Sequence, residues 1–251
     1  QLGPGNVYTF NSLGDVILSE VYGQNEQVVN YIGWEPRANA TWLINPTSSL
    51  KAFYSYAKQY MHLLSNSSSE SPTDIWLPSS NNIKPSSSSQ FGIGYYRNFD
   101  QNTYEFSIEA YYKDMLDLID YKIDAQVTLN PLVEGDLVFG YGRAYGAELF
   151  LKKRKGRLTG WIGYTLSKTE RRFEEINEDA WYPSKQDRTH DLSVVAMFQL
   201  NDRIQFSASW VYFTGNAVTF PERIYSINGQ DVFLYSDRNA YRMPDYHRLD
   251  V

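Results

Sequence analysis

Apolar and polar residues alternate strictly through four stretches in the second half of the chain. The apolar positions of these stretches lie two residues apart: Tyr145, Ala147, Leu149 and Leu151; Leu158, Gly160, Ile162, Tyr164 and Leu166; Leu192, Val194, Ala196, Phe198 and Leu200; Ile204, Phe206, Ala208, Trp210 and Tyr212. Successive side chains of a β-strand point to opposite faces, so each stretch predicts a strand with one apolar and one polar face.

The connections between these stretches alternate between short and long. Tight turns, around Lys153 to Gly156 and at Asn201 and Asp202, close two hairpins, and a charged loop of about residues 170–189 separates them. Short turns at one end and long loops at the other are typical of a membrane-spanning β-barrel. The pattern therefore predicts an all-β fold, a transmembrane antiparallel up-and-down β-barrel.

The remainder of the chain fits the same order. We expect further strands at residues 37–44, 49–63, 90–99 and 104–112 and from about 246 onwards, with hairpins through 16–22 and across Asn228-Gly229. We expect residues 65–89, 114–142 and 213–244 to be long outside segments. This makes about eight strands and a partial ninth, which indicates a segment of a larger barrel. The Ser-rich residues 65–89 predict a solvated loop, and an ordered loop that carries Trp76 toward a ligand is the alternative.

Composition agrees with a membrane barrel and excludes other classes. The 21 Tyr, 13 Phe and 6 Trp suit the aromatic girdles that barrels carry at both membrane interfaces. No run of eighteen apolar residues predicts a transmembrane helix. Cysteine is absent, which excludes disulfides and thiolate metal sites. With a net charge of −6 and no basic run, we expect no nucleic-acid partner.

Several stretches resemble the barrel of a TonB-dependent outer-membrane receptor of the Bacteroidota type. They are EPRANATWLINPTSSLKAFYSYAKQYMHLLSNS (35–66), DIWLPSSNNIKPSSSSQFGIGYYRNF (74–99), YEFSIEAYYKDMLDLIDY (104–121), GRAYGAELFLKKRKGRLTGWIGYTLSKTERRF (142–173), QDRTHDLSVVAMFQL (186–200) and YRMPDYHRLDV (241–251). Arg188-Thr189-His190-Asp191 before a strand is a recurrent pattern in these barrels. Residues 1–251 match the C-terminal half of such a barrel, so the plug domain, the TonB box and the first and last strands would lie outside them.

The resemblance implies a protein of the Gram-negative outer membrane with a 22-stranded barrel and an N-terminal plug. An inner-membrane TonB complex would drive import of a siderophore, cobalamin, oligosaccharide or peptide into the periplasm. Outer-membrane lipid and lipopolysaccharide would surround the barrel. The alternative is a scaffold subunit that holds surface lipoproteins through its loops. Neither hypothesis involves an enzyme or a cofactor.

Two groups of side chains are candidates for contact with a ligand. The loop aromatics Trp76, Trp181 and Tyr182 are suited to stacking on a sugar or an aromatic siderophore, and loop packing or a membrane girdle is the alternative role. The second group consists of carboxylates on the polar strand faces: Glu105, Glu109 and Glu148. A charge on the lipid face is costly, so we expect them to point into the lumen, where they would line the transport path.

Asp187, His190 and Asp191 are the residues that most resemble catalytic parts, since an Asp-His pair can act as a general base. We expect instead a cluster at the start of a strand that pairs with Arg188. His62, His190 and His247 lack metal-ligand spacing, so we predict no metal site.

The charged stretch RRFEEINED (171–179) predicts a solvated loop. Contact with lipopolysaccharide through divalent ions, which its carboxylates could bridge, is the alternative.

Overall fold

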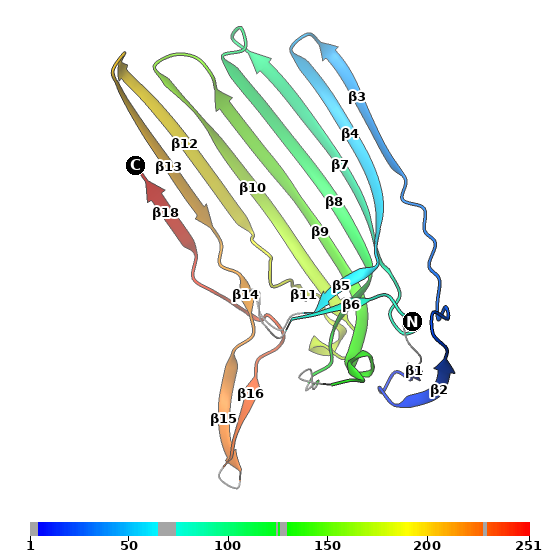
Figure 1. Ribbon diagram of the computed structural model, residues 1–251. Helices are drawn as coiled ribbons and strands as arrows, with labels where there is room; N and C mark the ends of the chain where they lie inside the picture. Colours follow the sequence, from blue (N-terminus) through cyan, green and yellow to red (C-terminus); the bar gives the residue numbers. More distant parts are fainter. Residues whose placement is uncertain (1–4, 65–73, 124, 126–129, 228–229) are drawn as a thin grey trace.

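Nine antiparallel strands follow one another across a curved ten-stranded sheet in the computed structural model, which describes residues 5–64, 74–123, 125, 130–227 and 230–251 (Figure 1). The strands are β3 (Arg37–Asn45), β4 (Ser48–Gln59), β7 (Ser86–Phe99), β8 (Tyr104–Tyr121), β9 (Leu137–Lys153), β10 (Leu158–Phe173), β12 (His190–Asn201), β13 (Ile204–Phe213) and β18 (Tyr246–Asp250). Their order in the sheet follows the chain, and the sheet remains open, with β3 and β18 at its edges. The predicted up-and-down order of eight strands and a partial ninth is confirmed.

All short turns lie at one end of the sheet and all long connections at the other (Figure 1). Side-chain carbonyls of asparagine stabilise two of the short turns. The Asn45 Oδ1 accepts from the Thr47 N–H at 2.9 Å, and the Asn201 Oδ1 accepts from the N–H groups of Arg203 and Ile204 at 2.9 and 3.0 Å. The alternation of connection lengths therefore divides the sheet into a short-turn end and a long-loop end.

Small elements gather at the long-loop end. They are the pairs β1 (Gly5–Phe10) with β2 (Val16–Tyr22), β5 (Met61–Leu64) with β6 (Ile75–Pro78), β14 (Ala217–Val218) with β17 (Tyr241–Arg242) and β15 (Pro221–Ile227) with β16 (Gln230–Tyr235), the strand β11 (Tyr182–Pro183) beside β10, and the 3-10 turns η1 (Val133–Asp136) and η2 (Asn177–Asp179). The predicted hairpin across residues 228 and 229 corresponds to β15 and β16, although these two turn residues lie outside the described residues. The hairpin predicted through residues 16–22 is instead wider, because 16–22 form the single strand β2, which pairs with β1. Among the described residues, no helix has the length and apolarity needed to span a membrane.

The strands extend beyond the limits that the alternation predicts. We expected residues 114–142 to be a loop, but β8 continues to Tyr121 and β9 begins at Leu137. Residues 86–89 likewise belong to β7 rather than to the Ser-rich loop. Polar and charged residues interrupt the apolar alternation in these stretches, but they do not prevent backbone pairing. β4 is shorter than expected and ends at Gln59, because the next residues leave the sheet to form β5, whose Leu64 packs against Ile83.

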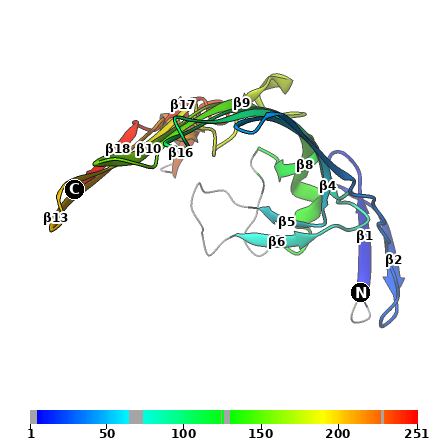
Figure 2. The same ribbon diagram turned by 90° about the horizontal axis from the view of Figure 1, so that it is seen from above.

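The two faces of the sheet differ in polarity. β5 and β6 lie on the concave side (Figure 2), and the Ser86 Oγ of β7 lies 3.4 Å from the Nδ1 of His62 in β5. The even-numbered residues of β7 therefore face the concave side, as do their cross-strand partners on β8, such as Glu109. The opposite, convex face exposes apolar side chains, for example Ile108 at 42% and Ile162 at 46%.

Among the described residues, the compact apolar clusters lie at the long-loop end. One buried cluster unites Leu64, Ile83, Tyr121, Val133 and Leu137. A second cluster unites Val138, Phe173, Ile176 and Tyr182. Both join the extended ends of β8, β9 and β10 to the long connections, so the loops are fixed to the sheet by packing as well as by hydrogen bonds.

Candidate functional site

Two carboxylates face each other on the concave side of the sheet. Glu109 of β8 is the cross-strand partner of Glu148 of β9. Lys51, Tyr96 and the two glutamates are among the residues that line a hollow of about 140 Å³ there, with the Lys51 Nζ 4.2 Å from the centre of the Tyr96 ring. The predicted inward orientation of Glu109 and Glu148 agrees with the register. The arrangement forms a polar wall that can contact water or a polar ligand.

Glu105 lies on the same face but at the short-turn end. Its carboxylate pairs with the Arg154 guanidinium, whose Nε donates at 3.1 Å. Arg154 belongs to the turn between β9 and β10, so this exposed ion pair links two neighbouring hairpin turns. Glu105 therefore lies apart from Glu109 and Glu148 and forms its own ion pair with Arg154.

Trp76 points away from the sheet. In the β5–β6 hairpin, Leu64 and Leu77 pack into the core, whereas Leu63 and its cross-strand partner Trp76 remain 43% and 62% exposed. Since the hairpin lies on the concave side (Figure 2), the Trp76 indole is accessible from that side. Stacking on a ligand stays a prediction, and the geometry leaves the ring free for it.

The side chains of Trp181 and Tyr182 have different surroundings, and neither shares those of Trp76. The Trp181 ring lies 4.3 Å from the guanidinium carbon of Arg143, which the register places on the convex face. A girdle position, the alternative that the sequence left open, fits Trp181. Tyr182 is 4% exposed in the cluster around Phe173, and its hydroxyl has no hydrogen-bond partner in the described residues. Burial raises the pKa of this hydroxyl, and a packing role fits its position.

An ion-pair cluster on the convex face escaped the sequence analysis. Glu170, whose side chain is 6% exposed, accepts from the Arg143 Nη2 and from the Lys168 Nζ, both at 2.7 Å. The cluster lies on the long-loop side of the stacked pair Tyr112 and Tyr145. Strand alternation alone could place these residues on one face, but it could not show that one carboxylate serves both cations.

The three catalytic candidates do not converge. The Asp187 carboxylate accepts from the Thr169 N–H and pairs with Arg242. The His190 Nδ1 lies 2.8 Å from the Tyr164 hydroxyl, and Asp191 lies 3.9 Å from the Arg188 Nη1. The predicted pairing with Arg188 holds for Asp191, but the partner of Asp187 is Arg242, fifty-five residues further along the chain. This arrangement lacks the contact between carboxylate and imidazole that a general base of this kind needs.

The long connections are bonded to one another as well. The Asn177 side chain exchanges two hydrogen bonds with the backbone of Arg238, at 2.7 and 2.9 Å. The Arg238 Nη1 donates to Asp120 of β8 at 3.3 Å, and Asn239 donates to the Pro183 carbonyl at 2.9 Å. Lys185 lies in the same region, and its burial lowers the pKa of its ammonium group. The chain from β13 to β18 therefore holds the β10–β12 connection and the end of β8 together.

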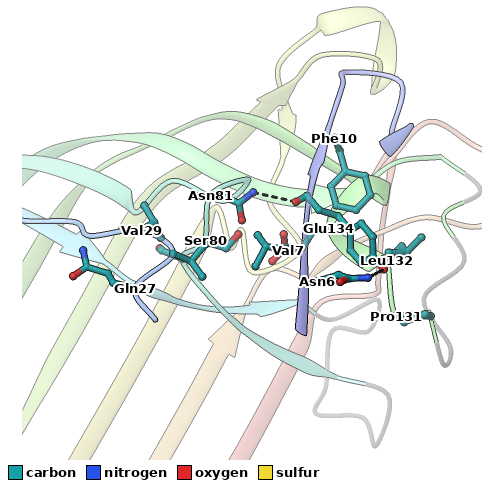
Figure 3. Close-up of a pocket in the computed structure, with 13 residues that line it drawn as sticks. Asn6, Val7, Phe10, Gln27, Val29, Ser80, Asn81, Pro131, Leu132 and Glu134 are labelled. Carbon is teal, nitrogen blue, oxygen red and sulfur yellow. Dashed lines mark hydrogen bonds between the residues drawn. The ribbon is translucent and has the colours of Figure 1, made fainter. Parts of the chain in front are cut away.

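A larger hollow of about 480 Å³ lies among the long connections (Figure 3). Its walls come from β1, residues 27–29, residues 79–81 and the segment around η1. None of the sequence candidates lies among its 13 lining residues, because the segments that meet there are far apart in the chain and carry no recognisable motif.

No metal site is apparent in the described part of the chain, where no three His, Asp or Glu side chains are grouped to hold an ion. Glu174 and Glu175 of the charged stretch are exposed at the long-loop end. Their bridging to lipopolysaccharide through divalent ions stays a prediction.

A family model described as TonB dependent receptor-like, beta-barrel, matches residues 15–251. No curated protein matches the sequence.

Solved structures resemble the fold at low sequence identity. The ferripyoverdine receptor of the outer membrane of Pseudomonas aeruginosa, bound to ferripyoverdine, superposes with a TM-score of 0.59 at 12% identity over 92% of this chain. The FpvAI–pyocin S2 complex superposes with a TM-score of 0.58 at 12% identity over 91% of this chain. The FrpB iron transporter from Neisseria meningitidis superposes with a TM-score of 0.51 at 14% identity over 79% of this chain. In each comparison the match covers 28% of the other chain, so this chain spans about that share of their length.

Proposed function

Since the chain belongs to the TonB-dependent receptor β-barrel family, we propose that it is part of a receptor that imports a nutrient into the periplasm. Barrels of this family lie in the outer membrane of Gram-negative bacteria, and so does this chain. In this orientation the convex face contacts lipid, the short turns lie in the periplasm and the long connections lie outside the cell.

The polarity of the two faces is the observation that carries the proposal. Large apolar side chains such as Leu149 and Ile162 are exposed on the convex face, and Lys51, Glu109 and Glu148 line the concave face. A charge on a lipid-facing strand costs roughly 2–4 kcal/mol for Lys or Arg near the middle of the bilayer, whereas a lumen accepts it. A wall of this kind suits a water-filled path for polar cargo.

The remaining parts of the import apparatus follow from the family. Further strands would close a barrel of 22 strands, a plug domain would fill it, and an inner-membrane TonB complex would supply energy. The Bacteroidota type belongs to this proposal too. The cargo classes are a siderophore, cobalamin, an oligosaccharide or a peptide, and the Trp76 indole and the carboxylates of Glu109 and Glu148 are the contacts we propose for it.

Deletion of the gene in its own bacterium tests the import function. Uptake of radiolabelled ferric siderophores, cyanocobalamin, oligosaccharides and peptides is measured with and without a protonophore. We expect one class to be lost on deletion, restored by the gene, and abolished when the proton gradient is dissipated. Normal uptake of every class in the deletion strain, or uptake that survives the protonophore, would refute energised import by this receptor.

One observation favours the scaffold role as a second candidate. The β15–β16 hairpin projects from the long-loop end (Figure 1), and its side chains include Ile224 at 61%, Phe233 at 48% and Tyr235 at 59% exposure. An exposed apolar arm suits contact with a surface lipoprotein. Affinity purification of the receptor with and without residues 221–235 tests this role, and an unchanged set of co-purified lipoproteins would contradict it.

A further inference from the structure

We propose that the hollow of about 480 Å³ at the long-loop end is a binding subsite for a neutral carbohydrate. The inference rests on the proposed import function and assigns a cargo class to it. The volume falls within the range of small-molecule pockets, roughly 300–1,000 Å³. In Figure 3, Gln27 and Val29 lie on one side of the hollow and Leu132 and Glu134 on the other, with Val7 and Ser80 between them.

Hydrogen bonds fix the walls of the hollow before any ligand arrives. The Asn82 Nδ2 donates to the Glu134 Oε2 at 2.6 Å and to the Tyr8 carbonyl at 2.9 Å, and the Asn82 Oδ1 accepts from the Phe10 N–H at 3.3 Å. One asparagine thus joins β1, the turn after β6 and η1. Asn81 adds a second bond to the Tyr8 carbonyl at 3.0 Å. A site whose walls are ordered in advance loses less entropy on binding.

Tight backbone packing supports the same wall. The Lys122 Nζ donates to the carbonyls of Ser12 at 2.9 Å and Gly135 at 3.0 Å, which ties the β1–β2 turn to η1. A Cβ atom added to Gly135 would lie 2.8 Å from the Gly14 carbonyl oxygen, so this approach requires glycine. The ammonium group of Lys122 is thereby committed to backbone carbonyls, and Lys122 does not line the hollow.

The polar lining matches a ligand rich in hydroxyl groups. It consists of one carboxylate, Glu134, together with the amides and hydroxyls of Asn6, Gln27, Ser79, Ser80 and Asn81. The Glu134 Oε1 accepts no hydrogen bond from a described residue, which leaves it available to a donor. A sugar hydroxyl donates one hydrogen bond and accepts two, so it can satisfy a carboxylate and an amide at once.

The charge of the lining disfavours an anionic ligand. None of the 13 lining residues, all in the described part of the chain, is lysine or arginine, and the undescribed residues contain neither type. A ferric complex or a phosphate that carries negative charge would meet Glu134 without a compensating cation. A single carboxylate among five neutral polar side chains also gives little preference for a cationic peptide.

The remaining lining residues are apolar and suit the carbon face of a sugar ring. They are Val7, Val28, Val29, Pro131, Leu132 and the aromatic Tyr8 and Phe10. A pyranose presents hydroxyl groups at its rim and C–H groups on its faces. A lining of six polar and seven apolar or aromatic residues therefore complements a neutral sugar better than a uniformly polar solute.

Glycan binding by the full-length receptor in detergent tests the assignment. The probes are neutral glucan, mannan, galactan and xylan oligosaccharides of four to eight units, their uronic-acid counterparts and a trilysine peptide. The best neutral glycan is then titrated by calorimetry against three variants. Glu134→Gln removes the charge at constant shape, Val29→Trp fills the hollow from an exposed wall position, and Glu174→Gln is the control, since it alters an exposed carboxylate outside the lining.

We expect Glu134→Gln to raise the Kd roughly 10- to 100-fold, as for the loss of a hydrogen bond to a charged group, and Val29→Trp to abolish binding, with no effect of Glu174→Gln. Failure of every neutral glycan to bind, preference for the uronic acids or the peptide, or an unchanged Kd in both pocket variants would overturn the subsite. Energised uptake of a siderophore without glycan binding would remove the subsite and leave the import function. Glycan binding without any energised uptake would support the subsite and refute the import function.

Discussion

Removal of the Asp187 carboxylate should loosen the long connections without unfolding the sheet. The side chain is 1% exposed, and it holds the Thr169 N–H and the Arg242 guanidinium. Asp187→Ala deprives both donors of their acceptor. The Arg242 guanidinium still donates to the backbone carbonyls of residue 187 at 3.1 Å and of Gly215 at 3.2 Å, so it retains two of its hydrogen bonds.

The expected cost is about 2–3 kcal/mol. A hydrogen bond to a charged group contributes about 1.5–3 kcal/mol, and breaking a fully buried ion pair costs about 3–5 kcal/mol. Arg242 is 32% exposed, so solvent screening moves the value toward the lower figure. Since about 1.4 kcal/mol corresponds to a factor of ten, local opening should become roughly 30- to 150-fold more frequent.

Amide hydrogen exchange of the full-length receptor in detergent measures this change. The N–H groups to follow are those of Ser167, which donates to the Thr189 carbonyl at 3.0 Å, and Ser184, which donates to the Thr169 carbonyl at 2.8 Å. Asp191→Ala is the matched control, because Asp191 is 43% exposed and lies 3.9 Å from the Arg188 Nη1. It should change exchange by about twofold or less. Exchange in Asp187→Ala that matches this control would refute the reasoning.

Three further predictions concern the faces of the sheet and one hairpin. Ile108→Lys on the convex face should lower the free energy of folding into lipid vesicles, measured by urea titration, by roughly 2–4 kcal/mol. Thr165→Lys on the concave face should change it little, and equal losses in the two variants would contradict the face assignment. Glu148→Gln removes one of two directly opposed carboxylates, so the free energy of unfolding should rise by about 0.2–1 kcal/mol. A higher unfolding temperature on heat-modified gels would show this, and a lower one would contradict repulsion from Glu109. Burial lowers the pKa of His62 in the folded hairpin. Below about pH 6.5 the imidazole is therefore protonated more readily in the unfolded chain than in the folded hairpin. Stability of β5–β6 should therefore fall as pH drops through that value, which exchange of its amides measures, and His62→Gln should remove the pH dependence.

The strand order could be predicted because it depends on local pattern. A side-chain period of two, interrupted by short turns and long loops in alternation, specifies an up-and-down sheet whatever the rest of the molecule does. The same pattern assigned Glu109 and Glu148 to the polar face, since lipid excludes charge from the other. It misplaced the ends of β8 and β9, because the pattern reports where the membrane ends and not where backbone pairing ends.

The long-loop end could not be predicted, because its contacts join residues far apart in the chain. Arg242 pairs with Asp187 across 55 positions, and Asn82 binds Tyr8 across 74. No periodicity selects one such partner over another, so only folding brings them together.

The sequence by itself therefore determined the class of fold, the order of its strands and the polarity of each face, since those follow from the alternation of side chains along a strand against lipid and water. Only the tertiary structure decided which loop residues are free to meet a ligand. It buried Tyr182, turned Trp181 to the convex face and left Trp76 exposed on the concave side. The packing of the loops against one another, which no local pattern encodes, also created the hollow beside Glu134.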